Sequence, residues 1–188
     1  MRTAPSTATS RTTNGTTNGT TSSSQPVHVV VDAVIDAAPA TVFAMITDIT
    51  RMGDWSPETV SAAWLDGATK AAEGARFKGN NRFGRLQWST KPTITRVEQD
   101  RVFEFAVPGK SGAIWRYDLR STEAGATAIT ESVHQQRPLP APIRFLQRRA
   151  GVTDRAANLR EGMTITLQRL SAAATSTTPN SQTTEILA

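Results

Sequence analysis

Glu131 is the residue of this chain whose type and surroundings most favour chemistry. It alternates with Ile129 and Val133, and this period of two residues predicts a strand with the three side chains on one face. A carboxylate on an apolar face is costly unless it is paired, hydrogen-bonded or protonated. A carboxyl group held in this way can act as an acid/base, or it can anchor the polar end of a ligand.

Two partners for Glu131 follow from the same strand parity. The hydroxyl of Tyr117 lies on the apolar face of another predicted strand, whereas Arg82 reaches the interior only if a bulge near Asn81 turns it inward. Asn81 lies four residues after Phe77 on one predicted strand, so both side chains point to the same face and Asn81 is a second polar group for the interior. In the alternative without a chemical role, Glu131 forms a salt bridge at the rim, or a twist of the strand points it to solvent.

Composition and motifs exclude several classes of site. The chain has no cysteine and only two histidines, which excludes thiolate chemistry and argues against a metal site built on several histidines. Gly109-Lys110-Ser111 matches part of a phosphate-binding loop, but the earlier glycine is missing and a strand follows, which predicts a hairpin turn. Asp48, Asp54 and Glu58 are explained as caps or turn residues. We find no catalytic motif, and we expect no cofactor and no metal.

Large apolar side chains line one face of three predicted strands, and charged residues line the other. Such faces suit an ordinary core between a sheet and a helix, and they equally suit the wall of a binding chamber. The predicted lining of a chamber combines sheet aromatics, two residues of a long helix and the polar groups: Trp88, Phe103, Phe105, Trp115, Tyr117, Leu159, Met163, Asn81 and Glu131.

The order of elements predicts an α+β fold. A strand at 27–35 precedes a short helix at 38–48 and a turn or second short helix at 51–55, which Pro57 ends. The period then becomes two residues, with turn-forming links between candidate strands at 60–65, 75–83, 86–97, 102–107, 114–120 and 126–135. Sequential strands with short links form an antiparallel meander, so we predict a curved antiparallel sheet of about seven strands.

A helix at 142–170 is the longest predicted element. Its apolar residues fall on one stripe that begins at Phe145, and arginines border the stripe on both sides. We predict that the sheet wraps around this helix, with Leu159 and Met163 facing a cavity and the aromatic strands instead of solvent. The predicted helix contains Gly151 and Gly162, and each of them either bends the helix or allows close packing.

The net charge of +5 and the pI near 10.4 are typical of nucleic-acid-binding proteins. From Arg137 to Arg169, seven arginines stand against Asp154 and Glu161, and this surplus equals the whole net charge. Because these arginines border an apolar stripe, we interpret them as side chains that cover the stripe with their stems and keep the guanidinium in water. Contact with an anionic membrane is the less favoured alternative, and we expect no nucleic-acid partner.

Both ends of the chain are rich in small polar residues and have too few apolar groups to offset the entropy of ordering. We predict disordered tails at 1–26 and 174–188 around one ligand-binding domain at 27–173. The N-terminal residues lack the apolar run of a signal peptide, and no run approaches transmembrane length. We therefore expect a cytoplasmic protein.

Several segments, taken in this order, resemble one superfamily. They are residues 34–43, 48–58, 74–82, 115–117 and 162–170, which include the motifs Trp55-Ser56-Pro57-Glu58 and Trp115-Arg116-Tyr117. The chain is similar to the START-like, birch-pollen-allergen-like superfamily (SRPBCC, helix-grip fold), in its branch labelled polyketide cyclase/dehydrase and lipid transport. The resemblance covers about 27–173, and it implies a curved sheet that grips the C-terminal helix around an elongated apolar cavity.

Three functions are compatible with these features. The first, which we favour, is the binding or carriage of a small hydrophobic or amphipathic ligand, such as a lipid, polyketide or aromatic compound, between sheet and helix. The second is a polyketide cyclase or dehydratase with Glu131 as acid/base and Tyr117 or Asn81 polarising a carbonyl. The third is an interaction module whose arginine-flanked helix meets an anionic membrane or a protein, which requires an exposed stripe.

Overall fold

The computed structural model describes residues 26–109, 112–138, 140–149, 151 and 154–177. Strand β1 (His28–Ile35) is followed by the short helices α1 (Pro39–Thr47), η1 (Ile49–Arg51) and α2 (Met52–Trp55). The remaining elements are β2 (Thr59–Trp64), β3 (Phe77–Phe83), β4 (Leu86–Thr90), β5 (Thr93–Glu98), β6 (Val102–Val107), β7 (Ala113–Ser121), β8 (Thr127–Gln135), α3 (Ala141–Arg149) and α4 (Arg155–Thr177). This order confirms the predicted α+β class.

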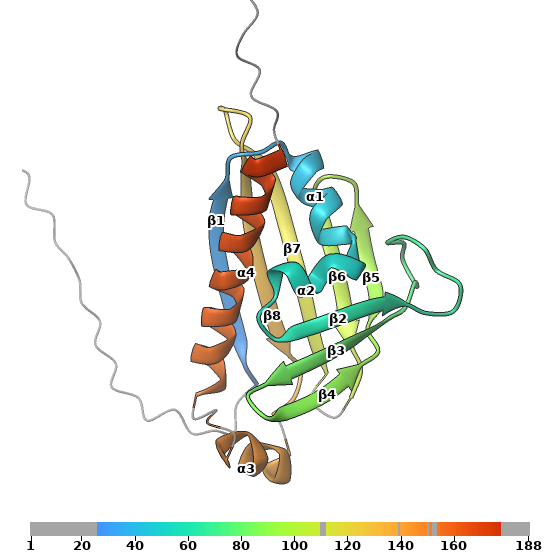
Figure 1. Cartoon of the computed structure of the whole chain (residues 1–188), viewed down its shortest axis with the longest axis vertical. Coiled ribbons are helices and arrows are strands. Elements are labelled where there is room, and N and C mark those ends of the chain that lie inside the picture. The colour runs from blue at the N-terminus through green and yellow to red at the C-terminus, as the bar shows by residue number, and fades with distance from the viewer. Residues whose placement is uncertain (1–25, 110–111, 139, 150, 152–153, 178–188) are drawn as a thin grey trace, which may run out of the picture.

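The strands form two antiparallel sheets, in the orders β1-β8-β7-β6-β5 and β2-β3-β4. A bridge between Arg76 and Thr93 and the hydrogen bond from Ile94 N to Ala75 O (2.9 Å) join the sheets into one curved wall (Figure 1). The predicted strand at 86–97 is two strands, β4 and β5, which belong to different sheets. Pro92 separates them, because proline has no N–H to donate to a strand ladder.

The prediction of a single helix at 142–170 is wrong, because α3 and α4 are separate helices. Gly151 lies between them with φ of +91°, a left-handed conformation that ends helices and is strained for side chains with a Cβ. Asp154 then starts α4, where its Oδ1 accepts a hydrogen bond from Ala157 N at 3.0 Å. Gly162 lies inside α4, and the helix continues through it.

Helix α4 runs to Thr177, through residues 174–177 that the sequence assigned to the C-terminal tail, and Ala174 is fully buried. The other predicted tail residues, 1–25 and 178–188, lie outside the described residues, so the domain boundaries stay predictions. In the described ranges, no helix combines the length and the apolar character that crossing a bilayer requires.

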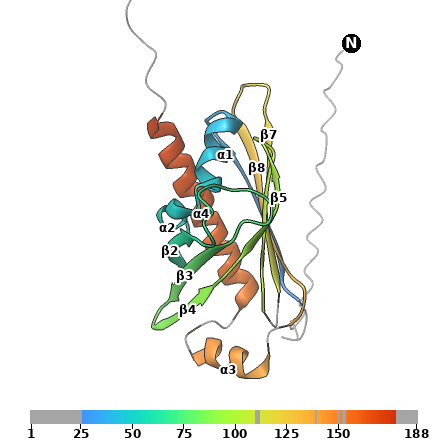
Figure 2. The same cartoon turned by 90° about the vertical axis from the view of Figure 1, so that its right-hand side faces the viewer.

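Helix α4 lies beside β1 and buries the side that faces the sheet (Figures 1 and 2). Leu167 and Leu170 join the main core with residues of α1, β6 and β7. Nearer the start of the helix, Leu159 and Met163 form a second cluster with residues of β1 and β8. The predicted apolar stripe is therefore confirmed for α4, whereas Phe145 of α3 is 63% exposed.

Arginines of α4 bind neighbouring elements, which corrects the prediction that they are a solvated margin. Both terminal nitrogens of Arg155 donate to the carboxylate of Glu58, at 2.6 and 3.1 Å. Arg169 donates to the backbone carbonyl of Trp55 at 3.3 Å. Glu58 lies in the bend after α2, which agrees with the predicted turn, and it is also an ion-pair partner that ties this segment to α4. Asp48 does cap η1, as expected.

Candidate functional site

Glu131 and Tyr117 form a buried pair across neighbouring strands. They are register partners on β8 and β7, and Tyr117 is in turn opposite Phe103 on β6. The Tyr117 hydroxyl donates a hydrogen bond to Glu131 Oε1 at 2.9 Å. Of the two predicted partners, the structure selects Tyr117, because Arg82 is exposed. Glu131 is 2% exposed, and its Oε2 has no hydrogen-bond partner within the described part of the chain.

Burial controls the protonation of this pair. It raises the pKa of Glu131 from the usual 4.5 to about 8, although the hydrogen bond from Tyr117 acts in the opposite direction. Burial, together with the nearby carboxylate, also raises the pKa of Tyr117 well above its usual range. At neutral pH the pair therefore consists of a neutral carboxylic acid and a neutral phenol. The acid proton on Oε2 can be donated to an acceptor that enters the site.

Aromatic side chains continue the wall from this pair toward the turn between β6 and β7. The next register row holds Val133, Trp115 and Phe105. Phe105 and Trp115 stack with their ring centroids 6.5 Å apart, and Phe103 and Tyr117 stack at 6.3 Å. Trp115 is partly buried and is the most exposed of the four rings. Trp115 is therefore the one of these four side chains that the fold leaves partly exposed.

Helix α4 covers part of this wall with apolar side chains. Leu159 and Met163 are buried and cluster with Val29 and Val133, and Trp115 packs against the same cluster. As predicted, the two helix residues face the sheet and not solvent. Neither of them lines the two cavities described below, so their contact with a ligand stays a prediction.

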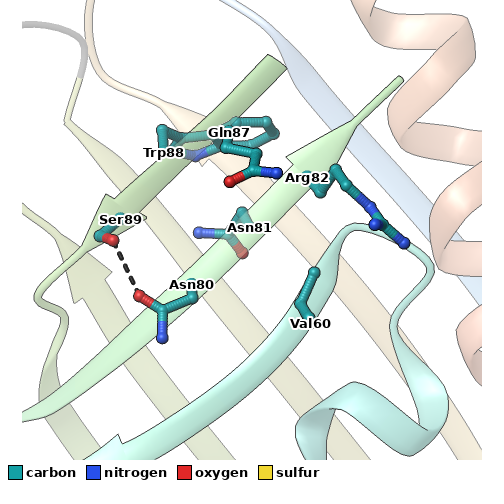
Figure 3. Close-up of a pocket in the computed structure, with 7 residues that line it drawn as sticks. All are labelled: Val60, Asn80, Asn81, Arg82, Gln87, Trp88 and Ser89. Carbon is teal, nitrogen blue, oxygen red and sulfur yellow. Dashed lines mark hydrogen bonds between the residues drawn. The ribbon is translucent and has the colours of Figure 1, made fainter. Parts of the chain in front are cut away.

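Asn81 and Trp88 are register partners on β3 and β4, in the smaller sheet. They contribute to a cavity of about 320 Å³ (Figure 3), with the further lining residues Val60, Asn80, Arg82, Gln87 and Ser89. Asn81 Oδ1 accepts a hydrogen bond from Thr59 Oγ1 at 3.1 Å, which engages its carbonyl in the pairing of β2 with β3. The structure thus brings Asn81 together with Trp88, while Glu131 and the other predicted residues lie on the larger sheet or on α4.

A second cavity, of about 480 Å³, lies near the start of α1. It is lined by Ala38, Pro39, Ala40, Asp100, Arg101, Leu119, Arg120 and Ser121. No predicted site residue lines it. Both cavities have volumes in the lower half of the range for sites that bind drug-sized molecules, roughly 300 to 1,000 Å³.

Sequence reasoning missed a polar cluster between α2 and α4. Arg155 Nε and Trp55 Nε1 are buried, and neither finds a hydrogen-bond partner among the described residues. Arg155 pairs with Glu58 through its other nitrogens. The motif that contains Trp55 and Glu58 was a visible signal, but the sequence did not indicate which residue of the distant helix reaches it.

Among the residues that the structure describes, no group of three or more His, Asp or Glu side chains could hold a metal ion.

In sequence comparisons, the model of a family described as polyketide cyclase/dehydrase and lipid transport matches residues 26–174. A search of curated proteins gives no match.

Solved structures with low sequence identity resemble this chain. Major latex-like protein 151 from Panax ginseng is 10% identical, with a TM-score of 0.61 over 79% of this chain and 97% of its own. A START superfamily protein from Mycobacterium smegmatis is 11% identical, with a TM-score of 0.57 over 80% and 99%. A protein from Chromobacterium violaceum is 15% identical, with a TM-score of 0.60 over 79% and 98%. These similarities show a shared fold, a curved antiparallel sheet around a C-terminal helix.

Proposed function

The chain belongs to the polyketide cyclase/dehydrase and lipid transport family of the START-like superfamily, and we propose that it binds a small apolar or amphipathic molecule against the aromatic wall of β6, β7 and β8. Membership of this family supports a ligand-binding fold. Proteins that share a fold differ in activity, so the argument for this chain comes from its own site. The observation that carries the proposal is the buried pair of Glu131 and Tyr117.

A buried carboxyl group with an unpartnered oxygen is costly in an empty apolar interior. The cost falls if a ligand supplies the missing partner. Because Oε1 of Glu131 already accepts from Tyr117 and the acid is neutral at pH 7, Oε2 offers a proton to the ligand. The complementary ligand is therefore an apolar molecule with one accepting oxygen, such as a ketone, an ester or an alcohol.

The proposed ligand site extends from this pair to the partly exposed Trp115. Trp115 and Trp88 are large apolar side chains that the fold buries only in part, and a ligand that covered them would add burial. We place the apolar body of the ligand against aromatic and helical residues, and its polar end at Glu131. The complete predicted set is Asn81, Trp88, Phe103, Phe105, Trp115, Tyr117, Glu131, Leu159 and Met163.

Displacement of the fluorescent dye ANS tests this proposal with two competitors, tetralin and α-tetralone, which share a carbon skeleton and differ by one carbonyl oxygen. We expect both to displace the dye and α-tetralone to bind about tenfold more tightly, which corresponds to one hydrogen bond of roughly 1.4 kcal/mol. The variant Glu131→Leu should bind both equally. Glu131→Gln is the matched control, because its amide N–H can still donate to the carbonyl.

The pH dependence of the preference for α-tetralone distinguishes the site at Glu131 from any other apolar surface. Above the Glu131 pKa of about 8, the ionised carboxylate has no proton to donate, so the wild type should lose its preference for α-tetralone. Glu131→Gln should keep its preference at the same pH. If neither compound displaces the dye, or if Glu131→Leu still prefers α-tetralone, the proposed site is wrong.

The same neutral acid favours a second candidate function, acid/base catalysis on a carbonyl compound. A pKa of about 8 lies close to neutral pH, where an acid/base is most effective. Uptake of solvent deuterium at the carbon next to the carbonyl of α-tetralone measures such catalysis. Exchange that depends on Glu131 and stops in Glu131→Gln supports an enzyme, and equal exchange with both proteins leaves ligand binding as the function.

A further inference from the structure

Helix α3 exposes apolar side chains that the rest of the fold does not cover. Phe145 is 63% exposed and Ile143 is 41% exposed. Residues two positions apart are rotated by about 200° around the helix axis, so their side chains point to nearly opposite sides. Since both are exposed, neither of these sides of α3 is fully packed against the body of the protein. This is the part of the predicted stripe that the fold leaves open.

The segment around α3 is strongly basic. Between residues 132 and 153 the sequence has no Asp or Glu and contains four arginines, Arg137, Arg144, Arg148 and Arg149. The guanidinium of Arg149 lies over the ring of Phe145, with 5.6 Å between Cζ and the ring centroid. An exposed aromatic ring beside a cation suits the boundary of an anionic bilayer, where the ring enters the apolar layer and the guanidinium binds phosphates.

Helix α3 occupies one end of the molecule, away from α1, and its axis runs across the long axis of the protein in both views (Figures 1 and 2). A flat surface that approaches this end therefore meets α3 side-on. The arginines of α4 do not compete for this role, because Arg155, Arg160 and Arg169 donate to groups of the protein itself.

We propose that α3 docks on an anionic lipid surface, with the exposed Phe145 ring entering the interface and the arginines of this segment binding lipid phosphates. A protein partner fits less well because the outward surface of α3 is smaller than the contact area of a stable complex. A helix of 9 residues is about 14 Å long, and its outward half presents on the order of 200 Å², against roughly 800 Å² per partner in a stable complex. Insertion of one aromatic ring and attraction between opposite charges together suffice for reversible binding to a membrane. The proposal is independent of ligand binding in the interior.

Sedimentation of the full chain with vesicles tests the proposal. We expect binding to phosphatidylcholine vesicles that contain phosphatidylserine, no binding to phosphatidylcholine alone, and release at about 1 M salt, where the Debye length is roughly 3 Å. Replacing Arg144, Arg148 and Arg149 by glutamine should weaken binding about a hundredfold, since each cation at the surface contributes a factor of about five. Phe145→Ser should weaken it about tenfold.

Matched variants elsewhere on the surface provide the controls. Replacing Lys70, Arg101 and Arg120 by glutamine removes the same charge from exposed positions outside α3, and Val34→Ser removes an apolar group that is 66% exposed on β1. We expect the control charge variant to lose less than about fivefold in vesicle binding and Val34→Ser to bind as the wild type does. Circular dichroism of every variant checks that the fold is kept.

Four results would overturn the proposal. One is the absence of binding to the serine-containing vesicles, and another is an equal loss of binding in the control charge variant. A third is binding to a DNA duplex that depends on the arginines and not on Phe145, which would make α3 a nucleic-acid surface. The fourth is a dimer in solution that Phe145→Ser converts to a monomer, which would assign this face to a second copy of the chain.

Discussion

The buried acid of Glu131 predicts that the wild-type protein loses stability as pH rises from 4.5 to 8. Its pKa in the folded state is raised to about 8, whereas an exposed glutamate in the unfolded chain keeps the usual 4.5. Between these values the folded state holds one proton that the unfolded state has released. The free energy of unfolding therefore decreases with rising pH, and the decrease stops once the folded protein also ionises.

The size of the effect follows from the same two values. One bound proton changes the free energy of unfolding by about 1.4 kcal/mol per pH unit. Across the interval from 4.5 to about 8, the loss amounts to about 5 kcal/mol. Because small domains have a total stability of roughly 5 to 15 kcal/mol, this single group would dominate the pH dependence.

Urea unfolding of the wild type and Glu131→Gln at several pH values measures the effect. The glutamine does not titrate but can accept the hydrogen bond from Tyr117, so the difference between the two proteins isolates the ionisation of Glu131. We expect the wild type to lose stability relative to Glu131→Gln up to pH 8 and to hold a constant difference above it. In Tyr117→Phe the hydrogen bond that lowers the Glu131 pKa is absent, so the loss should continue to higher pH. A difference that does not change between pH 5 and 8 would refute the assignment of a neutral, buried Glu131.

Three further predictions concern the elements that hold the site. Arg155→Leu should cost about 1 to 3 kcal/mol in the free energy of unfolding, because it leaves the carboxylate of Glu58 half-buried and unpaired; a cost below about 0.5 kcal/mol would mean that water replaces the guanidinium. Asp154→Ala should cost about 1 kcal/mol through the lost cap of α4, measured by thermal unfolding, and an unchanged melting temperature would contradict the cap. Gly53→Ala should destabilise by about 1 to 3 kcal/mol, because a Cβ there lies 2.8 Å from the carbonyl oxygen of Val60. The matched control Gly162→Ala meets only an ordinary contact and should be neutral or stabilising by up to about 1 kcal/mol; similar losses in both variants would count against the steric explanation.

Strand parity accounts for what the sequence predicted about the site. In an antiparallel ladder, the side of a residue is set by its neighbours two positions away, so Ile129 and Val133 place Glu131 on the buried face without knowledge of the partner strand. The pairing with Tyr117 needed one more fact, the register of β7 with β8, which the structure supplied. Local spacing therefore sufficed to place Glu131 on the apolar face, but it left Tyr117 and Arg82 as alternative partners.

The errors arose where the outcome depends on how distant elements meet. The apolar spacing of 142–170 fits one helix, and the break came from the left-handed backbone at Gly151, a conformation that glycine permits but does not require. Asn81 lies in the sheet β2-β3-β4 and Glu131 in the other sheet, so strand parity alone could not say whether they share a site, and the place of Asn81 in a ligand site stays a prediction. Parity says which side of its own strand a residue occupies, and it does not say which sheet that strand joins.

The break at Gly151 also explains why the basic charge of this chain has two different roles. If 142–170 were one helix, its arginines would all border one buried stripe. With two helices, Arg155 and Arg169 donate to fixed groups near α2 and help to hold α4 in place. Before the break, Arg149 is exposed and its guanidinium lies over the exposed Phe145 ring, so this charge is at the surface. Residues 132–153, which include α3, carry four arginines and no Asp or Glu, so most of the net charge of +5 falls in this segment of the sequence, which is the one that we propose meets an anionic surface.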